Sequence, residues 1–164
     1  MKLRGLEYDM VLSELADAVG EEHLSTRASD KLVYATDWSW MPQMWLDRGE
    51  EPPSPDFIVH PGSAEEIARV LQIASTYRVP VVTWGGGSGT QGGTIPIFGG
   101  IVLDMKRMNR ILNIDEKSLS VTAQAGVNIS ELEWAVNEKG LMFPHYAASS
   151  SGTATSRARL SPRE

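Results

Sequence analysis

The sequence predicts an α+β fold, with helices flanking a small sheet of parallel βαβ character. A short apolar run at residues 56–60 is followed by a segment of helical periodicity at 63–77 and a β-branched run at 81–83. A strand, a crossover helix and a second strand form such a unit, and its two strands run parallel. Residues 118–125 add an alternating apolar pattern, which is typical of a strand with one buried face.

Composition narrows the class of protein. The chain has 164 residues, a net charge of −6 and no cysteine. Its length allows one domain or slightly more. The acidic balance argues against a nucleic-acid partner, and the absence of cysteine excludes disulfides and thiolate metal sites. No apolar run approaches a membrane span and no signal peptide is evident, so we expect a cytoplasmic protein, with peripheral membrane association left open.

The first 50 residues read as a helix followed by an arm. Residues 8–19 have helical periodicity, with Asp9 as the expected N-cap and Gly20 as the stop. Residues 21–55 lose the periodicity but contain Trp38, Trp40 and Trp45. These tryptophans predict either a contact with a partner, membrane or substrate, or an arm pinned to the domain by buried indoles, which we favour. Prolines at 52, 53 and 55 mark the boundary of the arm.

The helix at 63–77 begins with a capping box of Ser63 and Glu66. Its expected apolar face comprises Ile67, Val70, Leu71, Ala74 and Tyr77. Further along, residues 101–104 read as a strand, 113–115 as a turn and 128–139 as a helix. A second capping box of Ser130 and Glu133 is expected to begin that last helix. Residues 156–164 are polar, without periodicity, and we expect no regular structure there.

A glycine-dense loop follows the strand at 81–83. Six of the nine residues from 85 to 93 are glycine, so the loop offers mainly main-chain N–H groups, which form anion nests. Residues 87–92 formally match the G-x-G-x-x-G dinucleotide fingerprint, which requires a helix at the glycines. Pro96, Gly99 and Gly100 exclude that helix, and no lysine follows for a Walker A loop. The sequence therefore predicts an irregular loop that binds phosphate.

The loop and its surroundings resemble the FAD-linked oxidases of the vanillyl-alcohol oxidase superfamily, which share a PCMH-type FAD-binding domain. The resemblance is carried by the run from Pro80 to Gly93, by residues 100–112 and by residues 121–127. Upstream, Tyr34 and Asp37 fit the family pattern too, as does the start of the helix at Ser63. The branch that the chain resembles most comprises the glycolate oxidase FAD subunit, D-lactate dehydrogenase and alkyldihydroxyacetonephosphate synthase.

This resemblance implies that the loop wraps the pyrophosphate of FAD through main-chain amides. The implied cofactor contacts are Trp84, Gly85, Gly86, Gly87, Ser88, Gly89, Thr90, Gln91 and Gly92, with Ser149, Ser150 and Thr155 in a second segment. Some family members link the flavin to a histidine in this loop. Ser88 stands at the equivalent position, which implies non-covalent FAD. No histidine spacing suggests a metal site, and His60 reads as structural or solvent-facing.

The implied function is the FAD-binding portion of an oxidoreductase acting on a 2-hydroxy acid or a similar CH–OH substrate. Two alternatives stay open: a fragment of an FAD-dependent ether-lipid (alkylglycerone-phosphate) synthase, or a non-catalytic nucleotide-binding remnant. The family pattern ends after Thr155, where Ser156 and Arg157 replace the expected apolar residue and glycine. We therefore expect an incomplete domain, with an N-terminal helix and an aromatic-rich arm at 1–50, a partial FAD-binding domain at 51–155 and an unrelated tail at 156–164. No catalytic residue is identified.

Overall fold

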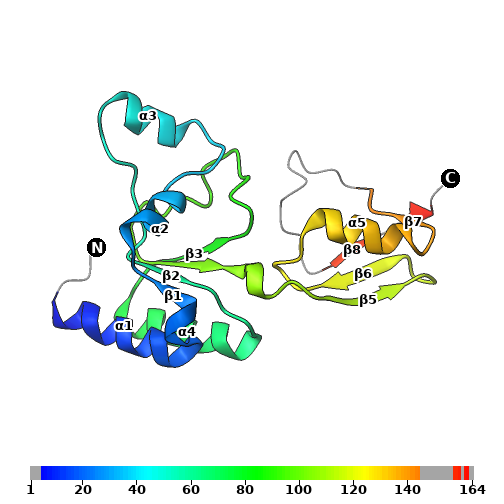
Figure 1. Ribbon diagram of the computed structural model, residues 1–164, viewed down its shortest axis with the longest axis horizontal. Helices are drawn as coiled ribbons and strands as arrows, with labels where there is room; N and C mark the ends of the chain where they lie inside the picture. The colour runs from blue at the N-terminus through cyan, green and yellow to red at the C-terminus, as the bar shows by residue number, and fades with distance from the viewer. Residues whose placement is uncertain (1–4, 145–156, 160, 163–164) are drawn as a thin grey trace. The chain divides into compact units, whose positions relative to one another are not determined.

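The computed structural model describes residues 5–144, 157–159 and 161–162, which form two compact units (Figure 1). The first unit is Met1–Asp104 and the second is Met105–Glu164. Within the described residues, no helix has both the length and the apolar character that crossing a bilayer requires.

The first unit is built on a four-stranded sheet, in the order β1 (Leu24–Ser25), β2 (Phe57–Val59), β4 (Ile101–Asp104) and β3 (Val81–Trp84). Strands β2 and β3 both run parallel to β4, which lies between them. The predicted parallel βαβ unit is therefore confirmed, with a third parallel strand inserted at its centre. Strand β1 adds an antiparallel edge to β2.

Helices α1 (Leu6–Val19) and α4 (Ala64–Tyr77) pack against each other beside this sheet (Figure 1). The ring of Tyr8 stacks on Phe57 of β2 with 4.7 Å between centroids, which ties α1 to the sheet. Helix α1 begins two residues earlier than expected. Its N-cap is Gly5, so the predicted role of Asp9 as the cap is wrong.

The predicted start of α4 is confirmed. Ser63 Oγ accepts from the N–H of Glu66 at 3.2 Å, and the Glu66 carboxylate accepts from the N–H of Gly62 at 2.7 Å. The predicted apolar face needs a correction, because Leu71 is 47% exposed and Ile73 is buried in its place. The buried stripe runs through Val70, Ile73 and Ala74, and Leu71 lies to one side of it.

The arm is more regular than its sequence indicates. It contains the 3-10 helix η1 (Glu21–His23) and helices α2 (Ala28–Val33) and α3 (Met41–Asp47). The favoured interpretation of its tryptophans is wrong for Trp38 and Trp40, whose residues are 66% and 70% exposed. The buried arm residues are instead small or hydrogen-bonding ones at the end of α2 and beyond it: Tyr34, Ala35, Ser39 and Pro42.

The second unit opens with the 3-10 helix η2 (Met105–Arg107) and contains a sheet in the order β5 (Ile111–Asp115), β6 (Ser120–Ala123) and β8 (Arg157–Arg159). The turn predicted at 113–115 is wrong, because these residues continue β5. The chain turns after Asp115, whose Oδ1 accepts from the N–H groups of residues 117 and 118. Strand β8 also lies where the sequence indicated no regular structure.

Helix α5 (Ile129–Asn137) is followed by strand β7 (Leu141–Met142), which pairs with β9 (Ser161–Pro162). The predicted capping box at α5 is wrong. Asn128 is the N-cap, its Oδ1 accepting from the N–H of Ser130 at 2.8 Å, and the Glu133 carboxylate accepts from the N–H of Phe143. The core of this unit comprises Val121, Ala123, Val127, Leu132, Val136, Leu141 and Phe143.

We expect the Ser63→Ala variant to lower the free energy of unfolding by about 1 kcal/mol, because α4 loses the acceptor at its N-cap. Urea denaturation measures this loss. Ser75→Ala is the matched control, since Ser75 is exposed within the same helix and caps nothing with its side chain. Equal losses in the two variants would contradict a capping role for Ser63.

Candidate functional site

The carboxyl ends of the three parallel strands carry polar and aromatic side chains. Trp84 ends β3, Asp104 ends β4 and His60 follows β2 directly. Ligands in open parallel sheets bind at this edge. The glycine loop leaves the sheet there too, immediately after Trp84.

A buried carboxylate lies at the centre of this edge. Asp104 has no exposed surface, and its Oδ2 accepts from the Tyr34 hydroxyl at 2.6 Å. The same oxygen is 3.8 Å from Nδ1 of His60, whose side chain is 31% exposed. Burial raises the pKa of the Tyr34 phenol, and the hydrogen bond to Asp104 raises it further. The sequence indicated a structural or solvent-facing role for His60, and the structure places its partly exposed side chain beside Asp104.

Trp84 connects this buried cluster to the glycine loop. Its residue is 4% exposed, and its indole meets the Tyr34 ring edge-on at 5.0 Å. Gly87 has a φ of 66°, and a Cβ added there would lie 2.4 Å from Cζ2 of the indole. Only glycine satisfies both conditions. The loop therefore packs against the buried Trp84 ring, and the Tyr34 ring contacts that ring and fixes its position.

Residues 37–41, which we call the arm segment, lie against the same loop. The N–H of Trp38 donates to the carbonyl of Gly89 at 3.0 Å, and the Thr94 hydroxyl donates to Asp37 Oδ2 at 3.2 Å. The methyl group of Met41 fills the space that a Cβ on Gly92 would need, and Gly92 has a φ of 72°. The loop is thus supported by Trp84 on one side and by the arm segment on another.

The main-chain donors of the loop remain unused by the protein. Within the described part of the chain, no hydrogen bond joins an N–H group of residues 86–92 to a protein acceptor. Residues 86, 89, 90 and 91 are exposed, residues 88 and 92 are half-buried and residue 87 is buried, so most of these groups are within reach of a ligand. Several free N–H groups on a loop with left-handed glycines form an anion nest. These residues therefore fit the diphosphate of a dinucleotide cofactor.

The structure brings together the predicted residues from Trp84 to Gly92, whereas Ser149, Ser150 and Thr155 lie outside the described residues. Three site residues were missed by sequence reasoning: Tyr34 and Asp104, which form the buried pair, and Ser39 in the arm segment. Tyr34 carried a family signal without an assigned role. Asp104 entered only as the last residue of the strand predicted at 101–104, and nothing in the sequence singled out Ser39.

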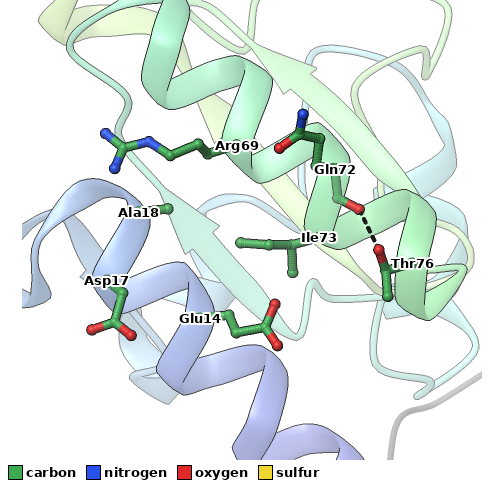
Figure 2. Close-up of a pocket in the computed structure, with 7 residues that line it drawn as sticks. All are labelled: Glu14, Asp17, Ala18, Arg69, Gln72, Ile73 and Thr76. Atoms are coloured by element: carbon green, nitrogen blue, oxygen red, sulfur yellow. Dashed lines mark hydrogen bonds between the residues drawn. The ribbon is translucent and has the colours of Figure 1, made fainter.

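A groove between α1 and α4 offers a contrasting surface (Figure 2). It is lined by Glu14, Asp17, Ala18, Arg69, Gln72, Ile73 and Thr76. Two carboxylates against one guanidinium make this surface unfavourable for a phosphate group. The Glu14 carboxylate also accepts from the Tyr77 hydroxyl at 2.6 Å, an exposed hydrogen bond between the two helices. The glycine loop is the better candidate for an anionic ligand.

Comparison with known proteins gives a consistent result. The profile of the FAD binding domain family matches residues 55–156. The chain is 39% identical over 134 residues to the glycolate oxidase subunit GlcD of Bacillus subtilis, and 33% identical over 136 residues to a D-2-hydroxyglutarate dehydrogenase of Xanthomonas citri. A solved structure of alkyldihydroxyacetonephosphate synthase aligns over 89% of this chain with a TM-score of 0.78 and 27% identity.

The chain is much shorter than these proteins. The alignments cover 82% and 83% of this chain but only 27% of the length of each of the two bacterial relatives. The synthase alignment covers 30% of that structure. The chain therefore corresponds to less than a third of the length of each of these proteins.

We expect the Tyr34→Phe variant to lower the free energy of unfolding by about 1–3 kcal/mol at neutral pH, because the buried Asp104 loses a donor. The wild-type pH dependence should change too. Because the folded-state pKa of Tyr34 is raised, its stabilisation is full below about pH 10, the ordinary pKa, and is lost as the pH rises through the raised value. The variant should lack this part of the alkaline loss. Urea denaturation between pH 8 and pH 11 measures both effects.

Tyr77→Phe is the control for this experiment. Its hydroxyl also bonds to a carboxylate, but at an exposed site, so we expect little change at neutral pH. A Tyr34→Phe variant as stable as the wild type would contradict a supporting role for the buried pair.

Proposed function

The chain belongs to the FAD binding domain family, and from this membership we propose that it binds FAD non-covalently through its glycine loop. We propose further that it is the flavin-binding portion of an oxidoreductase acting on a 2-hydroxy acid or a similar CH–OH substrate. The observation that carries the proposal is the set of unused N–H groups at residues 86–92, at the carboxyl edge of a parallel sheet. The names of the two bacterial relatives, which specify 2-hydroxy acids, support the substrate class.

In this proposal the cofactor diphosphate is held by neutral donors. The main-chain N–H groups of the loop bind the phosphate oxygens, and the side chains of Ser88, Thr90 and Gln91 add hydrogen-bonding capacity. Ser149, Ser150 and Thr155 complete the proposed cofactor contacts. Trp84 supports the loop from the sheet, and Tyr34 of the arm contacts the edge of the Trp84 ring on which Gly87 rests.

Bound FAD would supply the redox chemistry, by accepting a hydride from the substrate carbon. The residues of this chain would hold the phosphates and thereby orient the flavin. No base or substrate clamp is assigned to them. Non-covalent binding is supported by Ser88, which occupies the position where some family members carry a histidine that is linked to the flavin.

The proposal includes the domain organisation and the location. Residues 51–155 form a partial FAD-binding domain, preceded by an N-terminal helix and the arm at 1–50 and followed by the polar tail at 156–164. A cysteine-free sequence is compatible with the reducing environment of the cytoplasm, where we place the protein.

A second candidate is FAD-dependent ether-lipid synthesis. It is supported by the synthase structure, with its TM-score of 0.78, and by a synthase of Dictyostelium discoideum that is 34% identical over 100 residues. The two candidates share the flavin domain and differ in the substrate. Bleaching of the flavin absorption on anaerobic addition of a 2-hydroxy acid to the flavin-loaded protein would support the oxidoreductase and contradict the synthase.

We expect the purified chain to gain a visible flavin spectrum with FAD and to release all of it on acid precipitation. A chain that stays colourless after FAD is added would contradict the assignment of FAD as the cofactor. Flavin retained in the acid pellet would contradict non-covalent binding.

We expect Gly87→Ala to weaken FAD binding by at least about tenfold, because the added methyl group meets the Trp84 ring and displaces the loop. Titration of FAD fluorescence measures the affinity. Gly49→Ala is the matched control. Gly49 has a similar φ of 71°, but a Cβ there meets nothing within 4 Å, so this variant incurs the backbone strain without disturbing the loop. Similar losses in both variants would show that strain alone, and not the loop, determines binding.

A further inference from the structure

The arm segment contains a buried hydroxyl that the fold does not use. Ser39 is 9% exposed, and its Oγ has no hydrogen-bond partner. Among the side chains that the structure describes, it is the only buried polar atom in this condition. An unpaired buried hydroxyl costs about 1–3 kcal/mol, so native proteins rarely keep one without a reason.

The hydroxyl lies next to the glycine loop. Ser39 Oγ is 3.6 Å from the position that a Cβ on Gly92 would occupy. Its backbone is held in place, because the N–H of Ser39 donates to Asp37 Oδ1 at 2.9 Å while Asp37 Oδ2 accepts from Thr94 beyond the loop. The hydrogen bond from Trp38 to the carbonyl of Gly89 fixes the segment at a second point. These hydrogen bonds of the arm segment therefore hold Ser39 against the loop.

The unused groups on the two sides of this contact are complementary to the same ligand. The loop offers N–H donors, and the serine offers an O–H donor. A phosphate oxygen has several lone pairs and accepts from both at once. Met41 lies beside the hydroxyl with its methyl group over Gly92, and it is an unbranched, flexible side chain that is able to move aside.

We propose that Ser39 is a cofactor-binding residue, whose hydroxyl donates to a phosphate oxygen of the bound dinucleotide, so that the arm segment forms the second wall of the phosphate site. This inference rests on the proposed function, and it extends the site to residues about 50 positions upstream of the loop. Asp37 opposes an anion by its charge, but both of its oxygens already accept hydrogen bonds from Ser39 and Thr94.

The test is the Ser39→Ala variant of the whole chain, measured with three probes. We expect the affinities for FAD and for ADP, which competes through its diphosphate, to fall by the same factor of about 10 to 100, the value of a hydrogen bond to a charged group. Binding of riboflavin, which has no phosphate, should not change. The melting temperature of the ligand-free variant should stay the same or rise, because an unpaired buried hydroxyl is removed.

Ser29→Ala is the matched control, since Ser29 lies in α2 of the same arm and its exposed hydroxyl contacts only Asp30. Ser39→Cys, with a weak donor of similar size, should give an intermediate affinity for FAD. Unchanged FAD affinity in Ser39→Ala would overturn the inference. So would an equal loss for riboflavin, or a lowered melting temperature without the ligand. These results differ from a failure of the proposed function, in which the wild-type chain itself binds no FAD.

Discussion

The carboxylate of Asp104 imposes a constraint on the rest of the first unit. It ends the central parallel strand and has no exposed surface, and a buried polar group is stable only with hydrogen-bonding partners. One of these partners, Tyr34, comes from the arm and not from the sheet. Satisfying Asp104 therefore requires the arm to cross the carboxyl edge of the strands. The hydrogen bond between Tyr34 and Asp104 thus specifies where the arm lies, although the arm itself has few buried apolar side chains.

Tyr34 also affects the position of the glycine loop, through Trp84. The Tyr34 ring contacts the edge of Trp84, and the indole of Trp84 occupies the space that any side chain at position 87 would need. The loop is thereby held close to the sheet without using its own N–H groups. A loop with unused donors is a local violation of the rule that polar groups are paired. Such violations concentrate at functional sites, where a ligand completes the pairing.

The elements that were predicted correctly depend on local patterns. Ser63 and Glu66 are three residues apart, and the apolar residues of the βαβ unit recur with a regular period, so both signals lie within a short window. The errors have other causes. At α5, Asn128 and Ser130 are both residues that favour the N-cap, only two positions apart, and the helix begins after the first. The bond from Tyr34 to Asp104 spans 70 residues, a separation for which a single sequence offers no signal. The exposure of Trp38 and Trp40 likewise depends on the path of the arm.

Neutral donors suit this chain better than cationic ones. With a net charge of −6, the protein as a whole repels an anionic dinucleotide, and no lysine or arginine occurs in the loop or the arm segment. Binding by main-chain amides avoids the entropy cost of ordering long cationic side chains, because the conformation of the loop already fixes the positions of the amides. Asp37 lies near this loop, but its two carboxylate oxygens accept hydrogen bonds from the N–H of Ser39 and the hydroxyl of Thr94. It shapes the arm segment, and in the proposed site the phosphate is bound by uncharged groups.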